Sequence, residues 1–464
     1  MLKFTAFSEK HLKKIQGYTA NSPYRVCDLT AGVLLMWNDV FNVSFAEYDD
    51  TLILKCCFKN KFTVFFLPIG KNVLGALGEI ERYTVEKCLP LKFMCIEEEN
   101  LPFLKERYGE ISFEYDRDFS DYLYDYEKLT NLVGKKFSGQ RNHINSFNKL
   151  YPSAKFKPLL TRDIPRVKEF LKEYKKEHRG GGKIERHEFL NTIKLIDNLK
   201  KANFVGGFME VDGKMVSFTI GEYAGKTFVI HVEKALRNYK GVYPTTFNSF
   251  LKLCKKDGVI YINREDDSGD LGLRTSKLQY QPEMLLNKHF VEVKKPMKIK
   301  SPPTLKGERV VLSKITSGDK EFYHKLYTAK TLNRYWGYDY KKDIKNPTAD
   351  AFFNLQKNDF KNKNNLCLLI REKSLKTPIG EIVFHNFSYD KKVEIGVRLL
   401  KKYHGKGYAK ESLQLAISYA VNKLKLTPVA KCYHQNKSSL FALQSAGFVE
   451  NFNDNKYCHL IYKK

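Results

Sequence analysis

A run of basic and small residues near the C-terminal end stands between a predicted strand, residues 393–399, and a predicted helix that starts near residue 408. The run reads Lys401-Lys402-Tyr403-His404-Gly405-Lys406-Gly407-Tyr408-Ala409-Lys410-Glu411. Glycine lets backbone N–H groups come close to anionic oxygens, and the N-terminus of a helix carries partial positive charge. The order strand, glycine loop, helix therefore predicts a site for a phosphate ester, although a purely structural turn can have the same residues.

A second group of charged residues follows the predicted strand 259–262. It spans Asn263 to Asp270, and a further polar stretch covers residues 273–282. Buried strands rarely end in so many charges unless these pair or bind something. Two interpretations stay open: a structural network in which Arg264 pairs with Asp266 and Arg274 with Glu265, or a ligand site.

The formal net charge of +28 predicts an anionic partner. Transfer RNA, ribosomal RNA, an anionic membrane surface and the phosphates of coenzyme A fit this charge, as does a lysine-rich solvated surface without a partner. Residues 130–150 mix basic and amide side chains at helical spacing, which predicts either a phosphate-contacting helix or a solvated one. The nine cysteines form no Cys-x-x-Cys pair, so we expect neither a disulfide framework nor a metal site.

Apolar runs alternate with helical patterns along the whole chain, which predicts a mixed α/β fold. A basic, proline-rich stretch around residues 296–303 is typical of a linker, and Tyr151-Pro152 marks a second boundary. We expect units at residues 1–150, 151–295 and 304–464. The sequence shows neither a secretory signal nor an apolar stretch of membrane-spanning length, so the expected location is the cytoplasm.

The C-terminal residues resemble the GNAT superfamily of N-acetyltransferases. The loop matches through His404, Gly405, Gly407 and Ala409, with His404 where Gln or Arg is usual, and Asn436 with Gly447-Phe448 matches a second motif. The resemblance covers residues 304–464 and implies an acetyl-coenzyme A-dependent transfer to an amine. The residues that it implies for cofactor binding are Val397, Leu399, His404, Gly405, Lys406, Gly407, Tyr408, Ala409, Asn436 and Ser439.

The same resemblance implies that an amine attacks the thioester directly, so a base must take up its proton. Glu394 and Glu381 on neighbouring predicted strands are the candidate bases. Leu443 stands where relatives often have a tyrosine acid, so Tyr457, or Tyr433, is the candidate acid.

Residues from about 22 to 280 resemble the C-terminal domain of phosphatidylglycerol lysyltransferases, through the segments at 231–236, 241–244 and 262–282. This resemblance implies two acetyltransferase-like folds in tandem, so that the chain has three such domains, each with a mostly antiparallel sheet and flanking helices. It implies an acyl or aminoacyl acceptor site at Glu233, Lys234, Arg264, Asp266, Arg274 and Lys277. Tyr243 replaces a small residue in the corresponding phosphate loop, which argues against coenzyme A there.

Three functions follow as hypotheses. The first is an acetyl-coenzyme A-dependent N-acetyltransferase fused to a tandem acyltransferase-like module. The second is an aminoacyl-transfer RNA-dependent transferase, and the third is a non-enzymatic module that docks on RNA or ribosomes.

Overall fold

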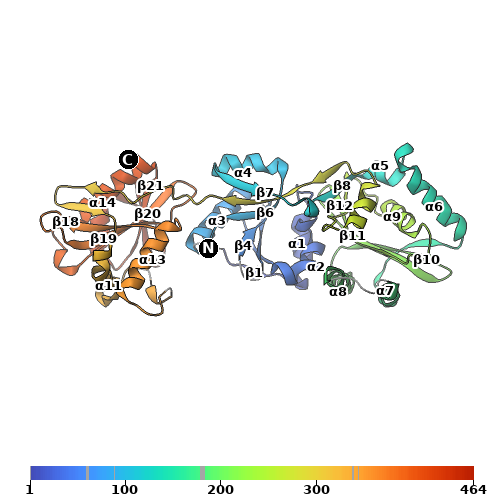
Figure 1. Ribbon diagram of the computed structural model, residues 1–464, viewed down its shortest axis with the longest axis horizontal. Coiled ribbons are helices and arrows are strands. Elements are labelled where there is room, and N and C mark those ends of the chain that lie inside the picture. Colours follow the sequence, from blue (N-terminus) through green and yellow to red (C-terminus); the bar gives the residue numbers. More distant parts are fainter. Residues whose placement is uncertain are drawn as a thin grey trace. The chain divides into compact units, whose positions relative to one another are not determined.

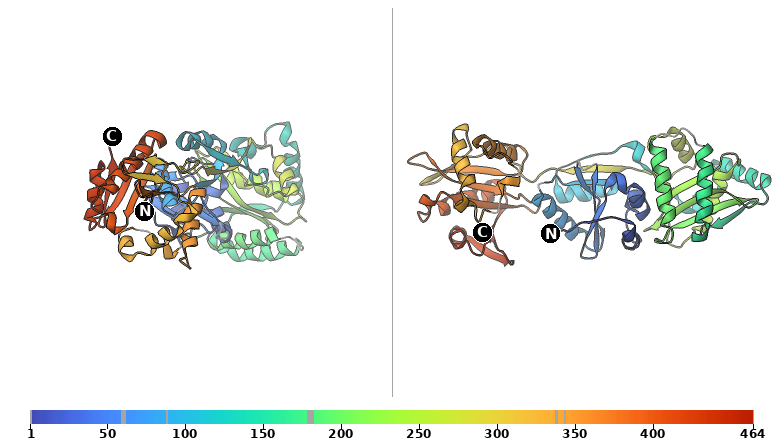
Figure 2. Two further views of the ribbon diagram at one scale, coloured as in Figure 1. Left: turned by 60° about the vertical axis from the view of Figure 1, so that its left-hand side comes forward. Right: turned by 90° about the horizontal axis from the view of Figure 1, so that it is seen from below.

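The computed structural model describes residues 2–58, 62–87, 89–177, 183–336, 339–342 and 344–463. The chain divides into two compact units (Figures 1 and 2). Residues 1–80 and 90–294 form the N-terminal unit, and residues 81–89 and 295–464 form the C-terminal unit. The described elements build three mixed sheets, which confirms the predicted α/β class with acetyltransferase-like domains.

The first sheet has the strand order β1-β2-β3-β4-β6-β15-β7, with β5 paired to β3. Its strands are β1 (Thr5–Ala6), β2 (Ser44–Tyr48), β3 (Thr51–Phe58), β4 (Phe62–Phe65), β5 (Ile69–Gly70), β6 (Lys92–Glu97), β7 (Ile111–Glu114) and β15 (Lys288–Val293). The helices in this part of the chain are α1 (Leu12–Thr19), α2 (Ala31–Phe41), α3 (Val73–Glu86) and α4 (Leu101–Tyr108). Buried Leu34, Leu35 and Met36 of α2 join a core that also takes side chains from the second sheet.

The second sheet has the order β14-β8-β13-β12-β11-β10-β9. Its strands are β8 (Asp121–Asp125), β9 (Lys155–Pro158), β10 (Val205–Val211), β11 (Lys214–Ala224), β12 (Thr227–Ala235), β13 (Tyr261–Asn263) and β14 (Met284–Leu286). Its helices are α5 (Tyr126–Asn131), α6 (Ser138–Leu150), α7 (Ile164–Glu177), α8 (Lys183–Asp197), α9 (Val242–Leu253) and α10 (Leu271–Leu278). Helix α9 lies on one face of this sheet and α7 and α8 lie on the other (Figure 1), and their apolar side chains belong to separate cores.

The two sheets of the N-terminal unit exchange segments of the chain. Strand β8 precedes residue 150 but pairs with β13 and β14 in the second sheet, whereas β15 returns to pair with β6 and β7 in the first. A boundary at residue 150 therefore does not separate the two sheets, because backbone hydrogen bonds hold each exchanged strand in the other half.

The third sheet has the order β16-β17-β18-β19-β20-β21-β23-β22. Its strands are β16 (Leu305–Lys306), β17 (Val310–Ser313), β18 (Leu366–Glu372), β19 (Pro378–His385), β20 (Lys392–Leu399), β21 (Thr427–Tyr433), β22 (Phe448–Asn453) and β23 (Tyr457–Tyr462). The helices are α11 (Lys320–Thr328), α12 (Lys330–Asn333), α13 (Ala349–Lys361), α14 (Tyr408–Ser418) and α15 (Lys437–Ser445). Helix α14 packs on one face of the sheet, and α11 and α13 pack on the other (Figure 1).

Among the described strands, each sheet contains one short parallel pair, and in the first sheet β4 and β6 pair only at Phe65 and Phe93. Strands β12 and β13 pair over Thr227–Val229 and Tyr261–Asn263, and β20 and β21 pair over residues 392–394 and 427–429. Beyond these residues the described parts of the partner segments show no further pairing with each other. We call the point where this pairing stops the fork. In the second sheet α9 begins shortly after β12 ends, and in the third sheet α14 begins shortly after β20 ends.

Candidate functional site

The loop before α14 is an open turn. Gly405 and Gly407 have φ angles of +74° and +81°, in the left-handed region that favours glycine. Residues 404–407 are exposed, and a Cβ atom added at Gly405 would meet nothing within 4 Å. The first backbone N–H groups of α14 follow at Tyr408, so this loop can receive an anion at a helix N-terminus.

Arg309 lies against this loop, a contact that the sequence analysis missed. Its Nη1 donates to the carbonyl of Lys406 at 2.9 Å, and its Nε donates to Glu411 at 3.1 Å. A Cβ atom on Gly407 would come within 3.0 Å of Arg309 Nη2. The arginine precedes β17, roughly a hundred residues earlier in the chain, and no local pattern links it to the loop.

The other residues of the expected cofactor site lie in the loop, on β20 beyond the fork, or at the start of α15. His404 bonds through Nε2 to the carbonyl of Leu399 at 2.9 Å, which ties the loop to the end of β20. Val397 and Leu399 belong to the part of β20 beyond the fork. Asn436 caps α15 by accepting from the backbone N–H of Ser439 at 3.3 Å, as expected for a residue that opens a helix.

The candidate catalytic residues have different environments. Glu381 is fully buried and lies 2.6 Å from Arg398, and the Cys367 thiol donates to its other oxygen at 3.1 Å. Glu394 is partly exposed and accepts from Asn386 Nδ2 at 2.8 Å. Glu381 is thus the partner of a buried arginine, and Glu394 is the carboxylate of the two that a substrate can reach.

Tyr457 and Tyr433 form a hydroxyl pair 3.2 Å apart at the ends of β23 and β21. Their hydrogen bond, with help from the ammonium of Lys456, lowers the pKa of Tyr457. Leu443 is buried in the core, so it leaves no room for an acid at that position. The two tyrosines are therefore candidate proton donors.

A cavity of about 2730 Å³ lies within the N-terminal unit. One part of its wall is apolar and comes from α2 and the first sheet, with Trp37, Phe41, Phe58, Met94 and Phe290. The opposite part is charged and comes mainly from the second sheet and the segment after β13. Its charged side chains include Asp28, Lys172, Lys175, Lys176, His231, Glu233, Lys234, Arg237, Arg264, Glu265, Asp266, Asp267, Lys277 and Lys288. Five of the six residues expected at the acceptor site thus meet in one cavity.

Arg264 bridges the two arms of the fork in the second sheet. Its Nη2 lies 2.9 Å from Glu233 Oε2 on β12, and its guanidinium stacks over Phe247 and Tyr280 at 4.3 and 4.8 Å from the ring centres. The side chains of Arg264 and Glu233 are only 10% and 14% exposed. The partner is therefore Glu233, not Asp266 as the sequence suggested, because strand geometry places residue 233 across from the chain that leaves β13.

The other charged residues after β13 are also paired. Arg274 binds Asp267 and Asp118 rather than Glu265, at 2.8 and 2.6 Å. Lys277 is buried and donates to the carbonyls of Arg264, at 2.7 Å, and of Asp266, so it holds this segment in place. Burial, together with the charge of Arg264, lowers the pKa of Lys277.

His231 lies between two glutamates at the base of the cavity. Its ring nitrogens are 3.0 Å from Glu222 and 2.8 Å from Glu265, and Gly32 N donates to Glu222 at 2.6 Å. Burial alone would lower the pKa of His231, but the hydrogen bonds to both carboxylates outweigh it and raise the pKa to about 9. The imidazole is therefore protonated at neutral pH, and this buried charge network joins α2 to β11 and β12.

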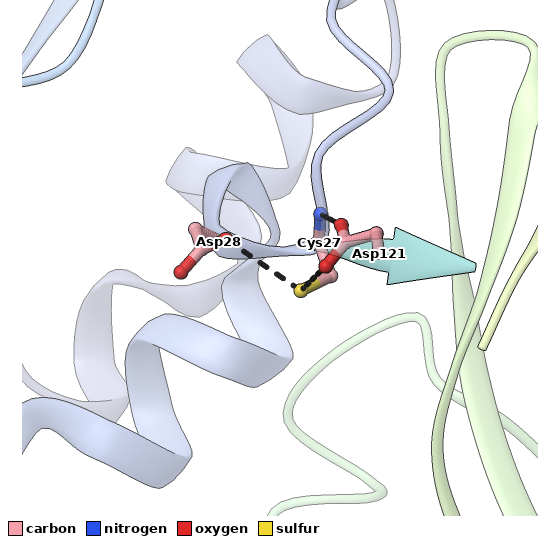
Figure 3. A group of neighbouring side chains, drawn as sticks. All are labelled: Cys27, Asp28 and Asp121. Atoms are coloured by element: carbon pink, nitrogen blue, oxygen red, sulfur yellow. Dashed lines mark hydrogen bonds between the residues drawn. The ribbon is translucent and has the colours of Figure 1, made fainter. Parts of the chain in front are cut away.

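Cys27, Asp28 and Asp121 gather their ligand-type atoms within 4.8 Å of one another (Figure 3). The Cys27 thiol donates to Asp121 at 3.3 Å. The Lys288 ammonium lies 2.8 Å from each aspartate, and these carboxylates raise its pKa well above the usual range although burial opposes this. Lys288 already supplies the cation of this cluster, and burial with the Asp121 charge raises the pKa of the Cys27 thiol and keeps it protonated.

The loop before α9 has the backbone of a phosphate loop but is covered. Gly241 has a φ of +83° and ψ of 6°, close to the +81° and −2° of Gly407. A Cβ atom on Gly241 would lie 2.4 Å from the carbonyl oxygen of His143 in α6. Helix α6 thus packs directly on this glycine, so this loop is covered where the loop before α14 is open.

Within the described residues, the helices are all too short or too polar to span a lipid bilayer.

Comparison with known proteins gives two family matches. The model of the phosphatidylglycerol lysyltransferase C-terminal domain matches residues 19–291, and the model of the acetyltransferase (GNAT) domain matches residues 309–449. Both expected resemblances are confirmed.

Individual relatives agree with this division. An uncharacterized protein of Mycoplasmoides gallisepticum is 26% identical over 233 residues, which are 49% of this chain and 70% of that protein. The uncharacterized N-acetyltransferase YoaA of Bacillus subtilis is 25% identical over 150 residues, 32% of this chain and 82% of its own. A crystal structure of a conserved protein of unknown function from Bacteroides thetaiotaomicron covers 63% of this chain and all of its own, with 29% identity and a TM-score of 0.58.

Proposed function

The chain belongs to the phosphatidylglycerol lysyltransferase C-terminal family, and on that premise we propose that it is an acyltransferase fusion whose C-terminal domain acetylates an amine from acetyl-coenzyme A. The two family matches support an acyltransferase with two modules. The acetyl donor, the amine acceptor and the roles of single residues are the proposal.

The observation that carries the proposal is the open glycine loop beside a fork. Gly405 and Gly407 leave the N-terminus of α14 uncovered, and Lys401, Lys402 and Lys406 surround it with positive charge. Beyond Glu394, strand β20 is free of β21, so its backbone N–H and C=O groups can face a ligand between the strands. A pyrophosphate fits the first feature and a pantetheine arm the second.

Each residue of this site has a proposed role in cofactor binding or proton transfer. The loop residues 404–409, with Arg309, would hold the pyrophosphate, and Val397, Leu399, Asn436 and Ser439 would line the arm. The bound thioester supplies the acyl group. Glu394 acts on the amine side, and Tyr457 or Tyr433 supplies a proton to the leaving sulfur.

Calorimetric titration of the full chain with acetyl-coenzyme A tests the loop. Wild type is expected to bind, and Gly407→Glu should weaken binding by at least about 100-fold, because a carboxylate there repels the pyrophosphate. Gly318→Glu adds the same charge at an exposed turn of the same domain and should bind like wild type. Absence of heat with wild type would contradict the proposal.

A second candidate function concerns the N-terminal unit, which would transfer an aminoacyl group from transfer RNA. The large charged cavity favours it, and so does the covered loop at Gly241, which leaves no place for the usual coenzyme A contact. Lys172, Lys175, Lys176 and Arg237 would lie next to the RNA backbone.

Labelled lysyl- and alanyl-transfer RNA test this second function. Transfer of the label to an added amine is expected, and Arg237→Glu should slow it at least about 10-fold, whereas Lys200→Glu, away from the cavity lining, should not. RNA binding that falls steeply with salt while no label moves would instead favour a docking module without chemistry.

A further inference from the structure

Three residue pairs across β19 and β20 belong to the face of the third sheet that meets α11 and α13. Glu381 is opposite Arg398, Val383 is opposite Gly396, and His385 is opposite Glu394. Arg398 and Val383 contact the aromatic core of this face, so alternation along each strand places the other pairs on the same side. The two acid–base pairs thus lie at opposite ends of one short row.

The pair of Glu381 and Arg398 is closed to substrate. The side chains of Glu381 and Arg398 are 0% and 5% exposed and lie 2.6 Å apart, under the rings of Tyr327 and Trp336. Releasing Glu381 to a substrate would leave the buried guanidinium of Arg398 without its carboxylate partner. This pair holds the two strands and α11 together and has no access to an incoming amine.

The pair at the other end is open and lies at the fork. The side chains of His385 and Glu394 are 29% and 17% exposed, with Nε2 3.8 Å from Oε1. Asn386 donates to Glu394 Oε2 at 2.8 Å, which orients the carboxylate and leaves Oε1 toward the imidazole. Glu394 is also the last residue of β20 that pairs with β21, opposite Val429.

Gly396, opposite Val383, lies between the two pairs. A Cβ atom on Gly396 would lie 3.3 Å from the ring of Trp336 and 3.7 Å from His385 Nε2. The glycine therefore lets β20 pass close to an indole and an imidazole, where even a methyl group would be crowded against Trp336. Its neighbour Val397 is the first residue expected to contact the acyl donor, so His385 Nε2 is close to the place where acyl transfer would occur.

We propose that His385 is the proton acceptor for the acetylation, with Glu394 as the counter-charge beside it. This assignment rests on the proposed function of the C-terminal domain. The alkylammonium gives one proton to His385 Nε2 and becomes a free amine. The N–C bond then forms as the C–S bond breaks and the sulfur takes a proton from Tyr457 or Tyr433. The second N–H proton restores that phenol, and His385 returns its proton to water.

The carboxylate of Glu394, 3.8 Å from His385 Nε2, attracts an ammonium group to the imidazole. Glu394 near the imidazole stabilises the imidazolium that forms, as a carboxylate does for a histidine base in general.

Two amines separate a proton acceptor from a structural residue. We would measure kcat and KM of the full chain at pH 7 with n-butylamine, which is protonated, and with aniline, which is already neutral. His385→Gln should lower kcat for butylamine by about 100-fold, the usual scale of general-base catalysis, and for aniline less than 10-fold. Glu394→Gln should show the same pattern more weakly, and His459→Gln, a histidine on β23, serves as the matched control.

The same preparations are titrated with acetyl-coenzyme A. Unchanged affinity in His385→Gln together with the selective loss for butylamine supports the assignment. Equal losses for both amines, or no loss, would overturn the role of His385 while wild-type binding of acetyl-coenzyme A keeps the proposed function intact. If wild type binds no acetyl-coenzyme A, the proposed function and the role of His385 both fail.

Discussion

The forks of the second and third sheets have the same backbone arrangement but are surrounded by different side chains and helices. Each has a parallel pair of three residues, then a glycine in nearly the same left-handed conformation, then a helix. In the second sheet Arg264 and Glu233 bridge the two arms, and α6 covers Gly241. In the third sheet the loop residues 404–407 are exposed, and the described contact at Gly407 is the end of the Arg309 side chain.

The difference teaches that the fold alone does not decide whether a fork accepts a ligand between its strands. A buried ion pair needs both partners in place, so Arg264 and Glu233 make the fork of the second sheet a rigid wall of the cavity. The fork of the third sheet has its buried ion pair, Glu381 with Arg398, on the adjacent strand pair instead, and the opening remains.

Removal of Arg264 should have the largest effect. Arg264→Met leaves Glu233 buried without its partner, so we expect the free energy of unfolding of the N-terminal unit to fall by about 3 kcal/mol or more. Arg264→Met combined with Glu233→Gln should recover much of this loss, because no unpaired charge remains. Urea unfolding of the three proteins measures both effects, and a double variant no better than the single one would mean that the pair is not what closes this fork.

The next largest effect should be the pH dependence of the stability of the N-terminal unit. The pKa of His231 is raised from 6.5 to about 9, so its contribution is fully present below pH 6.5 and is lost as the pH rises through 9. The contribution amounts to at most about 3 kcal/mol. Thermal unfolding between pH 6 and 10 should lose stability faster in wild type than in His231→Gln, and parallel curves would refute the buried imidazolium.

A methyl group added to the glycine of each loop should reduce the folding stability by different amounts. Gly241→Ala forces a Cβ atom to 2.4 Å from a backbone oxygen of α6, so α6 must move, and we expect a loss of about 2 kcal/mol. Gly407→Ala meets only the flexible end of Arg309, so the cost should be about 1 kcal/mol of backbone strain. Equal losses in thermal unfolding would show that α6 does not hold the first loop more tightly.

Local patterns predicted much of the fold. The expected strand 393–399 is β20 (Lys392–Leu399), and the helix expected to start near residue 408 is α14 (Tyr408–Ser418). Such elements depend on the spacing of apolar residues and on glycine at a helix start, which neighbours in the sequence determine. The membership of β8 and β15 in sheets of the other half depends on pairing between distant segments, and no local pattern carries that information.

The candidate sites divide in the same way. Residue types alone indicated the glycine loop at 404–409 and the charged segment after β13. Which charges neutralise one another was decided by the fold: Glu233 with Arg264, Lys288 with Asp28 and Asp121, and Glu381 with Arg398. His385 and Arg309 were missed because their partners lie on other strands or helices.

The sequence by itself determined the order of strands and helices, the glycines that allow tight turns, and the excess of positive charge. Only the tertiary structure decided which fork is open and which carboxylate can meet a substrate. The physical reason is that an ion pair or a covering helix depends on distance in space, and residues 31 apart, such as Glu233 and Arg264, become neighbours only when the sheet has formed.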